Sequence, residues 1–292
     1  MRRKGETMGN YFKIVPIKEG VTHIGDKMHV YATLITGTKS AILFDTTNGI
    51  GNLRACVESL TDLPYTVIAS HGHGDHTRGN YQFDEVLLHP ADFELCREWN
   101  SDEWRETSLN NAKKLNIVPD DFDCDAYLAG GTGNIQPLDV EKVYDLGGLT
   151  VEIVPMPGHT SGQIGLLIRE HRLLLTADAC NPMMWMFLKW ALSIPEWARM
   201  LEKVKELPFD YFLPAHIPDL LPKARMDVQI ETARRANMAD AVPMKHQPAI
   251  EGRPQAYVYS LGPISGDEQL EDIDFTAIYF IPEQLVDPEG NL

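Results

Sequence analysis

The stretch that decides the fold runs from residue 65 to residue 76 and reads YTVIASHGHGDH. Its first part, residues 65–69, is apolar and rich in β-branched side chains, which predicts a buried strand. The second part holds Gly72 and Gly74, and two glycines so close together weaken both helix and strand. We therefore predict a loop at the end of a strand, in which the two glycines free the backbone to turn.

This loop carries four side chains that bind metals, His71, His73, Asp75 and His76, in the pattern HxHxDH. Alternating positions can aim the imidazoles of His71 and His73 at one ion, while the other two turn towards a second. Neutral imidazole and carboxylate are ligands that suit Zn²⁺ and related first-row ions. A short HxH in a chain with 10 histidines could belong to a surface loop that binds nothing. The complete cluster after a strand favours a metal site.

Three further candidate ligands, His159, Asp178 and His216, also follow strand-like segments. Pro157-Gly158 predicts a sharp turn that presents His159 at a sheet edge. Taken singly, His159 could be a turn residue, and Asp178 could cap a helix. Functional side chains on loops at strand ends are typical of layered α/β folds, because the sheet fixes their geometry.

The order of these motifs resembles the metallo-β-lactamase superfamily over about residues 12–220. HxHxDH is followed by Gly-His-Thr-Ser-Gly at 158–162, Thr-Ala-Asp at 176–178 and Pro-Ala-His at 214–216. Asp45, after the apolar residues 41–44, matches the family's first motif, an acidic residue that supports the metal site. The implied fold is α/β, an αββα sandwich of two mixed sheets with outer helices.

The resemblance also implies a ligand set for two divalent ions, of which Zn²⁺ is the first choice and Mn²⁺ or Fe²⁺ the alternatives. His71, His73 and His159 would hold one ion, with Asp75, His76 and His216 on the other. Asp178 would bridge them, and Asp75 and Asp178 are the residues predicted to act in catalysis. A hydroxide between the ions would be the nucleophile, because metal binding lowers the pKa of water to about 7.

Within the family, Asp178 and His76 resemble the glyoxalase II and lactonase branches, which open thioesters and lactones. Acyl-homoserine lactonases typically carry a tyrosine where this chain has Asn181. We predict a hydrolase of a carboxylic ester, lactone or thioester. The alternatives are a persulfide dioxygenase with one iron, or β-lactam hydrolysis as a side activity.

Two segments around these motifs are candidates for the substrate site. Residues 183–190 begin shortly after Asp178 and are rich in methionine and aromatic side chains. This composition fits either a core segment or the wall of a substrate pocket, formed by Met183, Trp185 and Phe187. Pro182 argues against a continuous strand there. Residues 92–138 are predicted to be a lid-like insertion with some helix and a flexible tip at 130–133. Residues 1–11 would be a flexible N-terminus before one domain at 12–292, with a C-terminal extension from about 221.

The composition limits the partners. A net charge of −16 over 292 residues opposes nucleic-acid binding and favours a small-molecule substrate. No apolar run is long enough for a secretory signal or a membrane span, which predicts a cytoplasmic protein without a membrane partner. The 4 cysteines are far apart and are expected to be free thiols. A homodimer is left open.

Apolar runs between turn residues predict the remaining elements. Helices are predicted at 51–60, 90–99, 194–207 and 223–239. Strands are predicted at 12–17, 21–24, 28–35, 41–44, 65–69, 86–88, 150–154, 163–168, 172–176, 210–213, 256–260 and 275–281.

Overall fold

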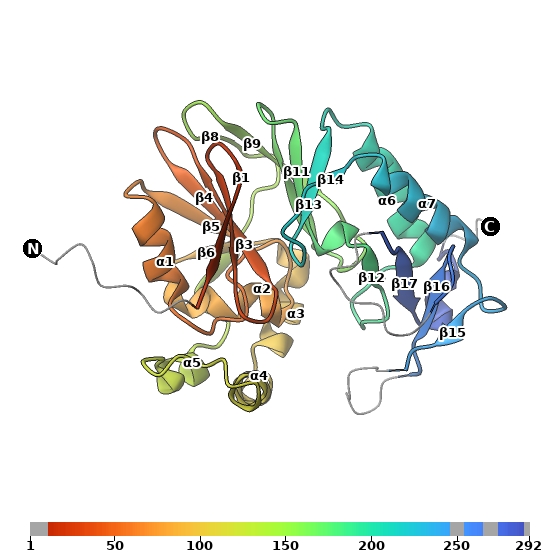
Figure 1. Ribbon diagram of the computed structural model, residues 1–292, viewed down its shortest axis with the longest axis horizontal. Coiled ribbons are helices and arrows are strands. Elements are labelled where there is room, and N and C mark those ends of the chain that lie inside the picture. The colour runs from red at the N-terminus through yellow and green to blue at the C-terminus, as the bar shows by residue number, and fades with distance from the viewer. Residues whose placement is uncertain (1–10, 246–253, 265–273, 289–292) are drawn as a thin grey trace, which may run out of the picture. The chain divides into compact units, whose positions relative to one another are not determined.

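The computed structural model describes residues 11–245, 254–264 and 274–288 (Figure 1). The chain forms two compact units, one of residues 1–139 with 145–149 and the other of residues 140–144 with 150–292. Except for Tyr11, the predicted flexible N-terminus lies outside the described residues. None of the described helices has the length and apolar character needed to cross a membrane.

The first unit contains a seven-stranded mixed sheet in the order β1-β2-β3-β4-β5-β6-β7. Strands β1 to β4 form an antiparallel meander, and β4 to β7 run parallel to one another. Their bounds are β1 (Lys13–Lys18), β2 (Val21–Gly25), β3 (Tyr31–Thr36), β4 (Ala41–Phe44), β5 (Tyr65–Ile68), β6 (Val86–Leu88) and β7 (Ile135–Pro137).

The parallel part of this sheet brings two of its loops together. Strand β4 is buried along its whole length, as strands covered on both faces are. Helix α1 (Leu53–Leu60), capped by Asn52, buries Leu53 and Val57 in the same apolar cluster. Because β4 and β5 are parallel and Phe44 pairs with Ile68, the loops that follow both strands lie at one edge of the sheet.

The predicted lid-like insertion, residues 92–138, is largely helical. The 3₁₀ turn η2 (Pro90–Asp92) and helix α3 (Phe93–Trp99) confirm the predicted helix at 90–99. Helices α4 (Asp102–Lys114) and α5 (Cys124–Ala129) agree with the expectation of some helix in this insertion. Their bounds were not predicted, because their apolar residues are too few to give a clear period. The glycine-rich turn at 130–133 is bound by the guanidinium of Arg105, which donates to the carbonyl of Gly131. A lid role stays a prediction.

The second unit contains a six-stranded mixed sheet in the order β14-β13-β11-β10-β9-β8. Strands β9, β10 and β11 are antiparallel neighbours, and β13 runs parallel to β11. The bounds are β8 (Val143–Asp145), β9 (Thr150–Pro155), β10 (Ile164–Ile168), β11 (Leu173–Ala177), β13 (Tyr211–Pro214) and β14 (Leu221–Pro222).

A third, four-stranded sheet in the second unit has the order β12-β17-β16-β15. Its strands are β12 (Met183–Trp185), β15 (Val242–Pro243), β16 (Tyr257–Ser260) and β17 (Ala277–Phe280), followed by the turn η4 (Pro282–Leu285). Residues 183–190 do not form a continuous strand, as Pro182 indicated, but Met183–Trp185 form the short strand β12. Pro182 stands just before β12, where a missing N–H costs the sheet nothing. Strand β12 therefore belongs to a sheet built largely from the C-terminal extension.

Two helices cover one face of this small sheet (Figure 1). Helix α6 (Ile194–Lys205) begins with a capping box between Ser193 and Glu196 and buries Trp197 completely. Helix α7 (Arg225–Arg235) buries Met226 and Ile230 in the same cluster. All predicted helices and strands are present, with bounds that differ by at most four residues from those predicted.

Candidate metal centre

The HxHxDH motif begins as a loop after β5, but it ends as a helical turn. Residues Gly74–Thr77 form α2, which continues into the 3₁₀ turn η1 (Arg78–Gln82). The expectation of a loop throughout was therefore wrong. The hydroxyl of Thr77 donates to the carbonyl of His73 at 2.9 Å and closes the turn, and Asp75 lies in its first turn, where a carboxylate stabilises the helix dipole.

The glycines of this motif provide space rather than conformational freedom. Neither Gly72 nor Gly74 has a positive φ, so the expectation that these glycines free the backbone to turn was wrong. A Cβ on Gly72 would lie 2.7 Å from the backbone oxygen of Asp92, and one on Gly74 would lie 2.5 Å from the guanidinium of Arg78. The buried carboxylate of Asp92 also accepts from the Gly72 amide at 2.9 Å. Helix α3 and Arg78 therefore pack directly against the motif's backbone.

Asp45 connects the end of β4 to the motif. Its buried carboxylate accepts hydrogen bonds from the Ser70 amide at 2.6 Å, the Ser70 hydroxyl at 2.9 Å and His76 Nδ1 at 2.9 Å. Asp45 has a φ of 70°, a conformation that aspartate tolerates better than most residues. A carboxylate only accepts, so His76 Nδ1 carries the proton. In the neutral ring, Nε2 then presents its lone pair, the form that binds a metal.

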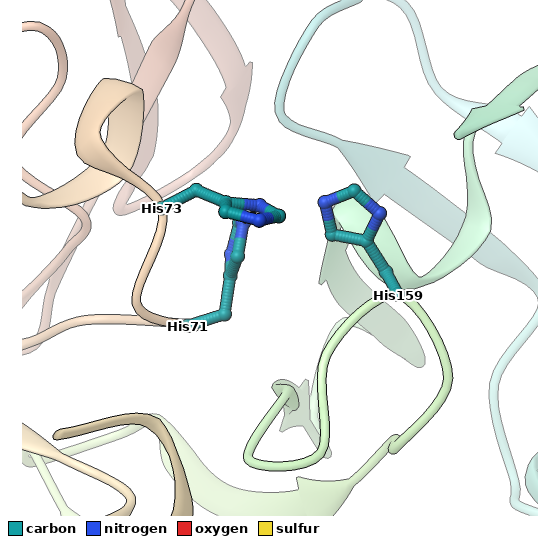
Figure 2. Close-up of side chains that lie close together, drawn as sticks. All are labelled: His71, His73 and His159. Carbon is teal, nitrogen blue, oxygen red and sulfur yellow. Dashed lines mark hydrogen bonds between the residues drawn. The ribbon is translucent and has the colours of Figure 1, made fainter. Parts of the chain in front are cut away.

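The imidazoles of His71 and His73 lie beside each other after β5 (Figure 2). Their ring centroids are 4.8 Å apart and their planes nearly perpendicular, with His71 Nε2 3.0 Å from His73 Nδ1. His71 Nδ1 is 2.9 Å from the hydroxyl of Ser70. The ring of Trp99 packs edge-on against His73 at 4.9 Å and stacks on Trp104. Two buried imidazole nitrogens thus face a common point in the first unit.

In the second unit, His159 occupies the loop after β9 (Figure 2). Its Nδ1 lies 2.7 Å from the carbonyl oxygen of Trp185, which can only accept. The proton is therefore on Nδ1, and Nε2 is the nitrogen that can act as a metal ligand; it lies 3.6 Å from the Asp178 carboxylate. Gly158 again provides space, because a Cβ there would lie 2.5 Å from the ring of Trp197.

Asp178 begins the 3₁₀ turn η3 (Asp178–Cys180) directly after β11. The preceding residue, Ala177, has φ 44° and ψ −124°, a strained conformation of the kind found at functional sites. The Asp178 carboxylate accepts from the Asn181 side-chain amide at 3.1 Å. His216, after β13, places Nε2 3.2 Å from the same carboxylate. The two candidate histidine ligands of the second unit, His159 and His216, therefore converge on the third, Asp178.

A model of the metallo-β-lactamase superfamily matches residues 25–216 of this chain. The chain belongs to the metallo-β-lactamase superfamily. This confirms the predicted family and α/β fold class. Among curated proteins, the chain is 24% identical over 174 residues to acyl-coenzyme A thioesterase MBLAC2 from Bos taurus and from Homo sapiens. These matches cover 56% of this chain and span 61% of each relative's length.

Solved structures show the same superfamily fold. A metallo-β-lactamase from Pontibacter korlensis superimposes with a TM-score of 0.56 at 13% identity, covering 77% of this chain and 100% of that one. The sec-alkylsulfatase Pisa1 from a Pseudomonas species gives a TM-score of 0.57 at 14% identity, covering 76% of this chain and 42% of that one. The family match ends at residue 216, before the C-terminal extension begins.

The donor sets of this family member fit divalent metal ions. The first unit carries His71, His73, Asp75 and His76, and the second carries His159, Asp178 and His216, and all seven are residue types that bind such ions. In each unit at least one imidazole has its Nδ1 fixed by an oxygen that only accepts, so that Nε2 is left as a ligand atom.

Several supporting groups were not predicted from the sequence. Ser70 links Asp45 to His71, Asp92 binds the motif backbone, and Asn181 holds Asp178. Ser70 directly precedes the motif, and Asn181 had been noted only as a departure from lactonases. A backbone carbonyl such as that of Trp185 leaves no signal in a sequence.

The predicted pocket residues lie on or next to β12. Met183 and Phe187 are buried in an apolar cluster with residues of the C-terminal extension, and Trp185 is half-buried beside it. Packing of Met183 and Phe187 in this cluster occupies their side chains. Their role in a substrate pocket stays a prediction.

Proposed function

We propose that this chain is a metal-dependent hydrolase of thioesters that carry a small, partly apolar acyl group. The observation that carries the metal dependence is the fixed orientation of His76 and His159, each with Nδ1 bonded to an oxygen that only accepts. The preference for a thioester is supported by the curated relatives, which are acyl-coenzyme A thioesterases.

The ligand assignment we propose follows the family pattern. His71, His73 and His159 hold one ion, Asp75, His76 and His216 hold the other, and Asp178 serves both. Zn²⁺ is the expected ion, with Mn²⁺ or Fe²⁺ as alternatives, because imidazole and carboxylate suit all three. Bound ions of this kind supply an activated water at neutral pH and polarise a carbonyl.

The residues of the chain orient these ligands and exclude solvent. Asp45 holds the proton of His76 Nδ1, so this ring does not turn and offers Nε2. His71, His73 and His76 are at most 3% exposed, and charge interactions are stronger in such an environment than in water. Asn181 donates to one oxygen of Asp178, which limits the rotation of this carboxylate.

A thioester suits this site, because the groups identified in it are metal ligands and the residues that orient them, and a thioester needs no side chain to protonate its leaving group. The leaving thiolate belongs to a thiol with a pKa of about 8.5, so it departs without the protonation that an amine requires. The carbonyl carbon is the atom attacked, and the sulfur takes the electron pair of the broken bond. No side chain has to act as a covalent nucleophile.

Substrate screening on metal-loaded protein tests this proposal. Acyl thioesters, carboxylic esters, lactones, β-lactams and phosphodiesters would be compared by kcat/KM, with elemental analysis of the same sample. We expect the highest kcat/KM for thioesters and about two ions per chain. A His71→Ala/His73→Ala variant should lose the activity and one of the two ions. One iron per chain with oxygen uptake on a persulfide would overturn the proposal in favour of the dioxygenase alternative. Light scattering would test the homodimer.

A further inference from the structure

We propose that the C-terminal extension is part of the scaffold of the metal centre, because it holds the backbone carbonyl that orients His159. This inference rests on the metal dependence proposed above. It gives a function to strand β17 and turn η4, which lie beyond the family match that ends at residue 216.

The first step is the hydrogen bond between His159 Nδ1 and the carbonyl oxygen of Trp185, at 2.7 Å. A metal-binding histidine is normally oriented by such a bond through its other nitrogen, and its loss costs about 10–100-fold in metal affinity. The position of the Trp185 carbonyl therefore determines where His159 Nε2 points. Trp185 is the last residue of β12.

The second step is the pairing of β12. This strand is at the edge of its sheet, and its neighbour there is β17 of the extension. Met183, Met184 and Trp185 pair in parallel with Ala277, Ile278 and Tyr279. Just after Trp185, the amides of Met186 and Phe187 both donate to the carbonyl of Tyr279, at 2.7 and 3.0 Å. The backbone on each side of the Trp185 carbonyl is thus bonded to β17.

The third step is the backbone between Asp178 and Trp185, which is held by later parts of the chain. Trp197 Nε1 donates to the carbonyl of Ala179 at 2.9 Å, and Gln229 Nε2 donates to that of Asn181 at 2.7 Å. The Ala277 amide donates to the carbonyl of Pro182 at 2.9 Å. Helix α6, together with helix α7 and strand β17 of the extension, therefore binds the segment between the candidate ligand Asp178 and Trp185, whose carbonyl supports His159.

Apolar packing fixes the two faces of the same strand. Met184 and Met186 are buried with Ile278 and Phe280 against helices α6 and α7. On the other face, Met183 and Phe187 are buried with Ala277 and Tyr279. The side chains of β12 are thus packed against the extension on both faces of the sheet.

A matched pair of substitutions in the extension tests this scaffold role. Gln284 donates through Nε2 to the carbonyl of Met186, next to Trp185, whereas Asp287 accepts from Arg199 on α6. Both residues are buried and lie close in sequence. Gln284→Ala removes a bond to the β12 segment, and Asp287→Asn weakens the anchoring of the extension elsewhere. The second variant is therefore the control for a general loss of stability.

Two readouts other than activity decide the result. Long-range ¹H–¹⁵N spectra of the metal-free protein report which nitrogen of His159 carries the proton, and chelator competition gives the Zn²⁺ affinity. In the native protein we expect Nδ1–H. Gln284→Ala should perturb this signal and lower the affinity for one ion by about tenfold, while Asp287→Asn changes the affinity by less than about twofold. Unchanged signal and affinity in Gln284→Ala would overturn the proposal.

Ala277→Pro is a second, stronger change, because it removes the amide that donates to Pro182. Circular dichroism would show whether this variant folds, and Gln284→Ala decides the question if it does not. If the native protein binds no metal at all, the proposed function fails. The spectrum of the metal-free protein still tests whether the extension orients His159, so the two failures are distinguishable.

Discussion

The two units present their candidate ligands in different ways. In the first unit, His71, His73, Asp75 and His76 lie within six consecutive residues after one strand. In the second, His159, Asp178 and His216 follow three different strands. The first set is oriented largely by the side chains of Ser70 and Asp45. The second set depends on chain segments far along the sequence, including Gln284, which donates to the carbonyl of Met186.

This difference extends to the atoms that orient the histidines. His76 is held by the side chain of Asp45, and His159 by the backbone of Trp185. A side-chain acceptor can be removed by one substitution. A backbone carbonyl is displaced only when its strand moves, so the orientation of His159 depends on the packing of a whole sheet. The two units therefore differ in how a point substitution can damage their ligands.

The largest effect is expected from Asp178→Ala, which removes the carboxylate on which the second unit's ligands converge. Metal occupancy and activity should fall together, with kcat/KM reduced by about 10³-fold, because metal ions supply several kcal/mol of transition-state stabilisation. Elemental analysis and steady-state kinetics measure both. Asp210→Ala, which removes an exposed carboxylate bound to Arg172, is the control. Retention of two ions by Asp178→Ala would show that this carboxylate does not bridge them.

Asp45→Ala tests the side-chain support of the first unit. The variant leaves the Ser70 amide and His76 Nδ1 without their acceptor, which should lower the free energy of unfolding by about 3 kcal/mol. Alanine at a φ of 70° adds a further cost of about 1–2 kcal/mol. Urea denaturation measures the change. Asp45→Asn keeps one acceptor oxygen, and asparagine tolerates this φ, so its free energy of unfolding should fall by less. Equal decreases in Asp45→Ala and Asp45→Asn would contradict this account.

Gly72 and Gly158, each next to a candidate ligand, test whether a side chain at these positions is excluded by close packing in both units. Gly72→Ala would push a Cβ against the backbone of Asp92, and Gly158→Ala would push one against Trp197. Each should lower the free energy of unfolding by about 1–3 kcal/mol, as overpacking does. Gly131 is the control for backbone strain, because it has a φ of 50° but nothing within 4 Å of its Cβ position. If Gly72→Ala and Gly158→Ala lowered the free energy of unfolding by less than Gly131→Ala does, the steric explanation would be refuted.

The smallest effect is expected on the rate of cysteine alkylation. A buried thiol reacts only when the structure around it opens, so Cys96 reports on the first unit and Cys180 on the second. Burial raises the pKa of the Cys96 thiol to about 11, and burial also raises that of Cys180. The thiolate is the reactive form, so at pH 8 half-exposed Cys124 should be alkylated before both. Peptide mass spectrometry of iodoacetamide-treated protein follows each site. Because the extension holds the Cys180 segment, Gln284→Ala should accelerate its alkylation more than that of Cys96.

The sequence by itself determined the family, the order of the ligands and the longer helices and strands, but not the short strands β7, β8, β12, β14 and β15. Apolar runs such as residues 41–44 and 86–88 gave strands with those same bounds, because buried strands require continuous apolar side chains. The HxHxDH pattern identified four candidate ligands after one strand, because all four lie within six consecutive residues. The bounds of α4 and α5 were not predicted, since few of their side chains are buried and apolar.

Tertiary structure alone decided what holds the ligands in place. Asp92 reaches the Gly72 amide from a later element, and Ser70 joins Asp45 to His71 only because β4 and β5 are parallel neighbours. The support of His159 is a carbonyl oxygen of Trp185, and every residue type has one. Hydrogen bonds to the backbone depend on where a strand lies rather than on which side chain it carries. For this reason the pairing of β12 with a strand near the end of the chain could not be read from residues 183–185.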